Sequence, residues 1–156
     1  MTDMTDILLA EPGLGALFLA SFLASTLLPL GSEWLLALLL TRGCPAPAAV
    51  AVATAGNTLG ACTTWLIGRY GGPWLVRRVL RLGAAEQARA EALYARWGTW
   101  SLLLSWLPVV GDPLCLVGGV LRVGFGRFLL LVTAGKFARY AALAWLVCRG
   151  MALAAA

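Results

Sequence analysis

The sequence predicts an all-α integral membrane protein built as an inverted repeat. Each half is expected to be a re-entrant helical hairpin followed by a transmembrane helix, with a central cytoplasmic amphipathic segment between the halves. Three observations support this prediction: an apolar composition, long stretches without charge, and a similarity between the two halves. Hydrophobic residues make up 61% of the chain and charged residues 12%, whereas soluble domains carry about 25% charged residues. The charges are too few to cover a surface that faces water.

Charge is nearly absent from four apolar stretches, which comprise residues 12–41, 43–68, 97–121 and 128–148. A transmembrane helix needs roughly 20 mostly apolar residues, so each stretch is long enough to enter or cross a bilayer. The charged side chains inside these stretches are Glu33, Asp112, Lys136 and Arg139. Because a charge within a bilayer is costly, these four residues are candidates for function.

The two halves of the chain resemble each other when the sequence is shifted by 79 residues. This shift aligns four features: Leu28-Pro29 with Leu107-Pro108, Glu33 with Asp112, Thr54-Ala55-Gly56 with Thr133-Ala134-Gly135, and Asn57 with Lys136. Chance explains matching leucines, but it does not readily explain an aligned Pro, acid and Thr-Ala-Gly without a gap. An internal repeat is therefore predicted.

The repeat defines the organisation of a single membrane domain over residues 1–156. The predicted segments are repeat 1 at 14–68 (hairpin 14–41, helix 48–68), a cytoplasmic basic connector at 69–98, and repeat 2 at 99–148 (hairpin 99–122, helix 127–148). Pro29 and Pro108 are expected to break the two hairpins, because proline removes a backbone donor. Interrupted apolar segments at corresponding positions of two halves are typical of a transporter binding site at the repeat interface.

The basic residues distinguish two topologies, because cytoplasmic loops are enriched in Lys and Arg. Six arginines mark the central connector as cytoplasmic: Arg69, Arg77, Arg78, Arg81, Arg89 and Arg96. If the broken segments are re-entrant, Arg122 and Arg127 join that side and only Arg42 and Arg149 lie outside. If they span fully, the repeats are parallel and the arginine distribution is less biased. Because re-entrant segments place more of the arginines on the cytoplasmic side, the inverted arrangement is favoured.

The connector itself allows two readings. Apolar residues alternate with its arginines at roughly helical spacing, which is typical of a basic amphipathic helix on the membrane surface. These residues are Trp74, Leu75, Leu82, Tyr94 and Trp97. A solvated connector that obeys the positive-inside rule fits equally well. The net charge of +5 is accounted for by topology, so no nucleic-acid partner is expected.

The four charged residues and Asn57 are predicted to form the functional site. Glu33 and Asp112 follow the breaking prolines, which places them near the hairpin tips, and there they could carry protons. Lys136 and Arg139 are three residues apart on one helix face, so they could bind an anionic head group or pair with the carboxylates. Asn57 is expected to line the same polar cavity. The alternative is that two buried ion pairs only lock the halves together.

Enzymatic chemistry is not expected. Histidine is absent, and Cys44, Cys62, Cys115 and Cys148 stand singly without metal-ligand spacing. No metal and no cofactor are predicted, and no nucleophile–base pair is visible. Acidic residues precede the first apolar stretch, which does not favour a cleavable signal peptide.

Several motifs together resemble the DedA membrane protein family, of the VTT/SNARE-associated type. They are Leu27-Leu28-Pro29 with Ser32-Glu33, residues 55–60 (AGNTLG), residues 105–112 (SWLPVVGD), and Gly135-Lys136 with Arg139-Tyr140. Within the family, the short YqaA-type branch is the most similar. The resemblance implies a bacterial inner-membrane, multi-pass protein with two re-entrant hairpins, and it maps the family's essential acid onto Glu33. Many members carry arginines around the second proline, where this chain has Ser105 and Gly111, so Lys136 and Arg139 would have to supply the positive charge.

The resemblance implies a role in moving lipids between leaflets. In some bacterial members the lipid is undecaprenyl phosphate and its movement is tied to the proton motive force, and eukaryotic relatives are similar to scramblases. We therefore expect a small inner-membrane lipid transporter or scramblase that could be proton-coupled, moving an anionic, polyprenyl-phosphate-like lipid. The expected partners are membrane lipids and protons, and a homo-oligomer is compatible with the sequence. The alternative is a non-transporting membrane factor that supports envelope integrity through partner contacts.

Overall fold

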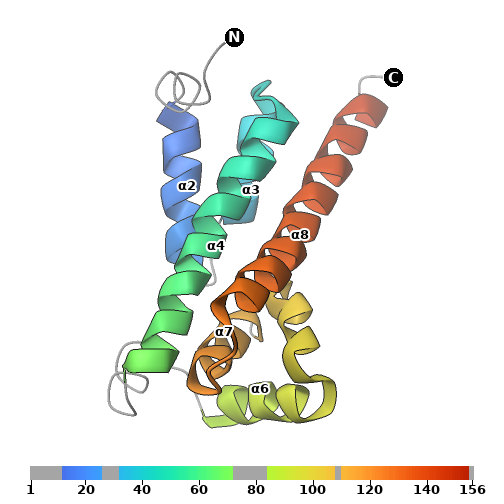
Figure 1. The fold of residues 1–156 in the computed structure, drawn as a ribbon. Coiled ribbons are helices and arrows are strands. Elements are labelled where there is room, and N and C mark those ends of the chain that lie inside the picture. Colours follow the sequence, from blue (N-terminus) through green and yellow to red (C-terminus); the bar gives the residue numbers. More distant parts are fainter. Residues whose placement is uncertain (1–11, 26–31, 72–83, 108–109, 155–156) are drawn as a thin grey trace.

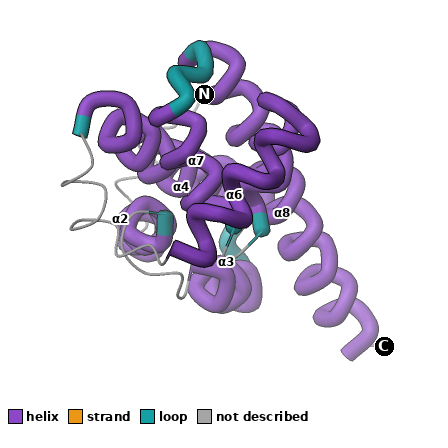
Figure 2. Tube along the Cα trace, turned by 90° about the horizontal axis from the view of Figure 1, so that it is seen from below, coloured by secondary structure: helices purple, strands orange, loops and turns teal. Residues whose placement is uncertain are grey.

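The computed structural model describes residues 12–25, 32–71, 84–107 and 110–154, and these residues are helical without strands (Figure 2). The all-helical prediction is confirmed for this part of the chain. The elements are α2 (Pro12–Ala24), α3 (Ser32–Thr41), α4 (Ala46–Tyr70), α6 (Ala84–Trp97), the 3₁₀ helix η1 (Gly98–Trp106), α7 (Gly111–Val120) and α8 (Phe125–Ala154). The predicted helix-breaking residues Pro29 and Pro108 lie outside the described residues.

Two helices, α4 and α8, are long and apolar enough to cross a membrane. Their 25 and 30 residues correspond to lengths of about 37 and 45 Å, against about 30 Å of hydrocarbon in a bilayer. Proline in the first turn of α4 helps to start this helix, because its missing N–H has no intrahelical partner there. The two helices run in opposite directions, with α4 descending and α8 ascending in Figure 1.

The element boundaries follow the 79-residue shift found in the sequence. Helices α3 and α4 begin at Ser32 and Ala46, and α7 and α8 begin 79 residues later, at Gly111 and Phe125. The turns after α3 and α7 also match, because each contains a residue with positive φ, Gly43 (87°) and Arg122 (56°). Corresponding elements also pack in corresponding ways. Within the halves, α2 packs on α4 and η1 packs on α8, and between the halves, α7 packs on α4 and α3 packs on α8.

The apolar core consists of two separate clusters. One lies among α2, α3, the start of α4 and the later part of α8, and it includes Leu17, Leu36 and Ala53. The other lies among the end of α4, α6, η1, α7 and the start of α8, and it includes Trp65, Leu114 and Phe128. Along both α4 and α8, the stretch between the clusters carries polar side chains instead.

Helix α6 lies across the end of the molecule where α4 ends and α8 begins (Figure 1). Its Tyr94 hydroxyl donates to the carbonyl of Leu114 in α7 at 3.0 Å, and Gly118 leaves room for the phenol because a Cβ there would collide with it. Burial raises the pKa of Tyr94 further above its ordinary value, which already leaves the phenol neutral at physiological pH. Tyr94 thereby attaches the connector to the second half of the chain.

Glycines allow close approach between the helices along one stripe of small residues in α4, which comprises Gly56, Gly60, Thr64 and Gly68. A Cβ at Gly56 or Gly60 would fall within 3.0 Å of a backbone carbonyl of α2, and one at Gly68 would meet α7 in the same way. Thr64, within this stripe, donates to the carbonyl of Ser25 at 3.2 Å. These close contacts are structural, and they bring α2 and α7 against α4.

Candidate functional site

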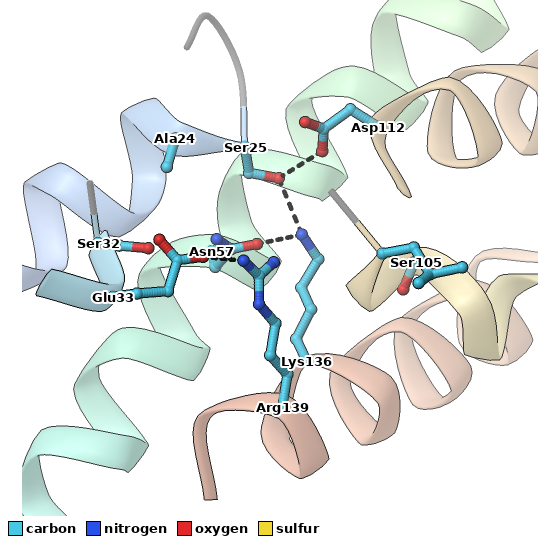
Figure 3. A pocket seen from close by; sticks show the side chains of 10 residues that line it. Ala24, Ser25, Ser32, Glu33, Asn57, Ser105, Asp112, Lys136 and Arg139 are labelled. Carbon is cyan, nitrogen blue, oxygen red and sulfur yellow. Dashed lines mark hydrogen bonds and ion pairs between the residues drawn. The ribbon is translucent and has the colours of Figure 1, made fainter. Parts of the chain in front are cut away.

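A polar cavity of about 40 Å³ lies between the two apolar clusters (Figure 3). Its walls come from the end of α2, the start of α3, the middle of α4, the end of η1, the start of α7, and α8. The lining residues are Ala24, Ser25, Ser32, Glu33, Asn57, Ser105, Leu107, Asp112, Lys136 and Arg139. Both halves of the chain therefore contribute to a single site.

Lys136 is the centre of the buried part of this site, with only 3% of its surface exposed. Its Nζ donates to Asn57 Oδ1 and to Ser25 Oγ at 3.0 Å. Ser25 Oγ in turn donates to Asp112 Oδ1 at 3.2 Å. Because an ammonium group can only donate, Ser25 Oγ accepts from Lys136 and its own proton is directed to Asp112. Ser25 thus connects the Lys136 ammonium to the Asp112 carboxylate.

A second chain of hydrogen bonds runs from Lys136 toward α3. Because Asn57 accepts from the lysine through Oδ1, its Nδ2 is the donor to the Tyr140 hydroxyl, at 2.9 Å. The same hydroxyl lies 2.8 Å from Ser32 Oγ. Tyr140 is almost completely buried, so this chain ties α8, α4 and the first residue of α3 together away from water.

Arg139 forms the more exposed part of the site. Its guanidinium makes an ion pair with Glu33 and donates to the carbonyl of Trp106 at 2.9 Å. Both charged side chains remain about one third exposed, at 28% for Arg139 and 34% for Glu33. Arg139 therefore joins α8 to the start of α3 and to the end of η1.

The amino-terminal ends of two short helices meet at the cavity. Ser32 and Glu33 open α3, and Asp112 lies in the first turn of α7. A helix N-terminus carries a partial positive charge, which stabilises carboxylates in the first turn and favours bound anions. The site therefore combines two helix N-termini and two cations with two carboxylates.

The volume of the cavity limits what it holds in this conformation. A cavity needs roughly 10–15 Å³ for one water molecule, so this one has room for about three. A lipid head group requires more space than this cavity offers in the described structure.

The structure brings together the described residues that the sequence singles out: Glu33, Asp112, Lys136, Arg139 and Asn57. Their roles in transport remain predictions. The pairing is more specific than expected, because Arg139 contacts Glu33 directly while Lys136 reaches Asp112 through Ser25. Sequence reasoning assigned no role to four further residues: Ser25, Ser32, Ser105 and Tyr140. Within the described parts of the chain, no cluster of His, Cys, Asp and Glu could hold a metal ion.

Comparison with known proteins gives the family, because the VTT domain matches residues 8–148. The chain belongs to the VTT-domain (DedA) family. It is 40% identical over 137 residues to the inner membrane protein YqaA of Escherichia coli, which covers 87% of this chain and 92% of YqaA. YqaA of Shigella flexneri matches to the same extent.

An uncharacterized protein of Haemophilus influenzae is 38% identical over 138 residues, covering 83% of this chain and 84% of that protein. No solved structure matches the chain. The prediction of the family from the sequence motifs is confirmed.

Proposed function

We propose that this protein is a multi-pass protein of the bacterial inner membrane that moves an anionic lipid between leaflets, coupled to protons. The observation that carries the proposal is the cavity in which two helix N-termini, Lys136 and Arg139 face Glu33 and Asp112. A site of this kind, formed by broken helices at the interface of two halves, is typical of secondary transporters. The inner-membrane location of the relative YqaA supports the proposed location.

The proposed topology is an inverted repeat with two re-entrant hairpins. The 13 residues of α2 and the 10 residues of α3 correspond to about 20 and 15 Å, too short to cross a bilayer. The antiparallel course of α4 and α8 and the matching element boundaries support opposite orientations of the halves. The end of α4 and the start of α8 lie near α6, whereas the end of α8 lies at the opposite end of the bundle (Figure 1). Arg69 is at the end of α4 and Arg127 at the start of α8, whereas Arg149 is near the end of α8, which agrees with a cytoplasmic connector.

Cysteine labelling tests this topology. Single cysteines at positions 42 and 122, in a background without the native cysteines, should react with a membrane-impermeant maleimide from opposite sides of intact inverted and right-side-out vesicles. Labelling of position 122 from the same side as position 42 would exclude re-entrant hairpins and with them the inverted repeat.

Charge balance suggests how protons and the lipid are coupled. The cavity holds two cations and two carboxylates, so an anionic head group adds an uncompensated charge unless a carboxylate becomes protonated. A proton on Glu33 weakens its ion pair and leaves Arg139 free for the head group. Glu33 and the head group thus compete for Arg139, and proton binding favours lipid binding.

A scaffold function is the second candidate, and one observation favours it. The network of Arg139, Glu33 and the Trp106 carbonyl ties three elements together around a cavity too small for a head group. In this case the charges would serve only stability, and the protein would support envelope integrity through partner contacts.

Transport by the wild-type protein separates the two candidates. The full chain is reconstituted into liposomes with fluorescent phosphatidic acid or phosphatidylcholine, and dithionite accessibility measures translocation with and without a pH gradient. We expect faster translocation of phosphatidic acid that depends on the gradient. Rates equal to those of protein-free liposomes for both lipids would reject transport of this lipid class and favour the scaffold.

A further inference from the structure

Ser105, near the end of η1, lines the cavity with a hydroxyl that has no hydrogen-bond partner. Its surface is 4% exposed, and its Oγ makes no hydrogen bond to the described residues although it is buried. A buried hydroxyl without a partner is unfavourable, and such groups are frequently completed by a bound ligand or water. Ser25 and Ser32, which line the same cavity, are already hydrogen-bonded.

Two glycines bring the backbone close to Ser105. A Cβ at Gly111, the first residue of α7, would fall within 3.0 Å of the Ser105 carbonyl oxygen. A Cβ at Gly135 in α8 would lie 3.5 Å from Ser105 Oγ. The Ser105 backbone is therefore packed against the N-terminus of α7, and its hydroxyl lies beside the residue that precedes Lys136. Both the helix N-terminus and the lysine stabilise a negative charge in this part of the cavity.

Other buried hydroxyls show why position matters. Ser21, Thr54 and Thr58 also lack a partner, but they lie within α2 and α4 and do not line the cavity. Among these unpaired hydroxyls of the described chain, Ser105 is the one in the cavity wall. Ser21, which is also fully buried, provides a matched control.

We propose that Ser105 donates a hydrogen bond to an anionic, phosphate-type oxygen of the ligand that enters this cavity, and so helps to determine its specificity. The inference rests on the proposed function. Lys136 and the N-terminus of α7 supply positive charge, which attracts any anion, whereas a fixed hydroxyl donor selects an acceptor oxygen at one position. A site with such a donor rejects ligands that cannot accept, because the donor would be left unpaired.

The test compares ligand binding by the purified full chain in detergent. Thermal unfolding is titrated with dihexanoyl phosphatidic acid, with inorganic phosphate, and with dihexanoyl phosphatidylcholine, for wild type, Ser105→Ala and Ser21→Ala. A hydrogen bond to a charged oxygen corresponds to roughly a tenfold change in affinity. We expect Ser105→Ala to weaken binding of phosphatidic acid about tenfold, while Ser21→Ala stays within about twofold of wild type. Without ligand, Ser105→Ala should be at least as stable as wild type.

The arms of this experiment give distinct outcomes. A response to phosphatidic acid alone identifies a lipid head group as the source of the oxygen, and an equal response to inorganic phosphate identifies a free phosphate. If wild type binds and Ser105→Ala binds equally well, the Ser105 inference is wrong while the proposed function stands. If wild type binds neither phosphatidic acid nor phosphate, the phosphate-type specificity of the cavity fails, and the Ser105 inference fails with it.

Discussion

The long helices α4 and α8 present different residues to the cavity at positions that correspond under the 79-residue shift. Asn57 corresponds to Lys136, and these two side chains contact each other. Gly60 corresponds to Arg139, and Gly60 has no space for a side chain because a Cβ would collide with α2. Each half thus contributes one carboxylate to the cavity, Glu33 or Asp112, but both cations come from the second half. This asymmetry favours one shared anion site over two equivalent sites.

The first helix of each half, α2 or η1 (here called its first arm), differs in type between the halves. Helix α2 has 13 residues in an α-helix, whereas η1 has only 9 residues in a 3₁₀ helix. With rises of about 1.5 and 2.0 Å per residue, the two arms reach similar lengths, about 20 and 18 Å. A long 3₁₀ helix is uncommon, and here it lets a shorter segment reach the same level of the bundle. The two halves therefore reach the cavity by different local structures.

The largest expected effect comes from removing the central cation. Lys136→Met removes the charge that reaches the half-buried Asp112 carboxylate through Ser25, which should cost about 3 kcal/mol, the lower end of the cost of breaking a buried pair. Asn57→Ala, the matched change in the first half, removes the hydrogen bonds to Lys136 and Tyr140 but no charge, and it should cost about 1–3 kcal/mol. Chemical unfolding in detergent measures both changes.

A double change identifies the cause of the Lys136 effect. Adding Asp112→Asn to Lys136→Met should recover part of the lost stability, because the uncompensated charge is then gone. Strictly additive losses would show that Lys136 and Asp112 are not coupled through Ser25.

Matched glycines test whether the backbone packing is equivalent in the two halves. Gly56 and Gly135 correspond under the shift, and a Cβ at either would fall within 3.0 Å of a carbonyl oxygen in the first arm of its own half. Gly56→Ala and Gly135→Ala should therefore destabilise the protein by similar amounts, about 1–3 kcal/mol each. Gly126→Ala is the control, since a Cβ there meets nothing within 4 Å. A loss at only one of the two positions would break the equivalence.

The smallest expected effect concerns the turns that follow α3 and α7. Arg122 has φ 56° where the corresponding residue of the first half is Gly43, with φ 87°. Positive φ strains a residue with a side chain, so Arg122→Gly should stabilise the protein by about 1 kcal/mol and Gly43→Ala should destabilise it by a similar amount. Thermal unfolding shows both signs, and a loss of stability in Arg122→Gly would mean that its side chain contributes more than the strain removes.

The long helices have a clear signal in the sequence, because their apolar runs are continuous and begin beside proline or glycine. In the structure these helices are α4 (Ala46–Tyr70) and α8 (Phe125–Ala154). The charged site residues could also be found, since Glu33 and Lys136 are conspicuous in apolar segments. The extent of η1 as a 3₁₀ helix has no comparable signal, because its residues Trp100 to Trp106 are as apolar as those of an α-helix.

The neutral members of the site were harder to predict. Ser25, Ser32 and Ser105 are ordinary small residues in apolar segments, where serine commonly serves packing, and only the tertiary arrangement shows which hydroxyls meet. Tyr140 did carry a signal, because it lies four residues after Lys136 and thus on the same helix face. Its contact with Asn57 depends on how α4 and α8 cross, which no local pattern specifies.

The most direct test of the account is proton-dependent translocation by Glu33→Gln beside Asp112→Asn. Glutamine keeps the shape of a protonated glutamate, so Glu33→Gln should abolish the stimulation of phosphatidic acid translocation by a pH gradient. Its thermal stability should be largely preserved, because a partly exposed ion pair contributes little. Asp112→Asn should instead reduce stability, because buried Lys136 loses its counter-charge, and its remaining translocation should still respond to pH. A Glu33→Gln protein with the wild-type rate and pH profile would contradict the claim that Glu33 is the proton site.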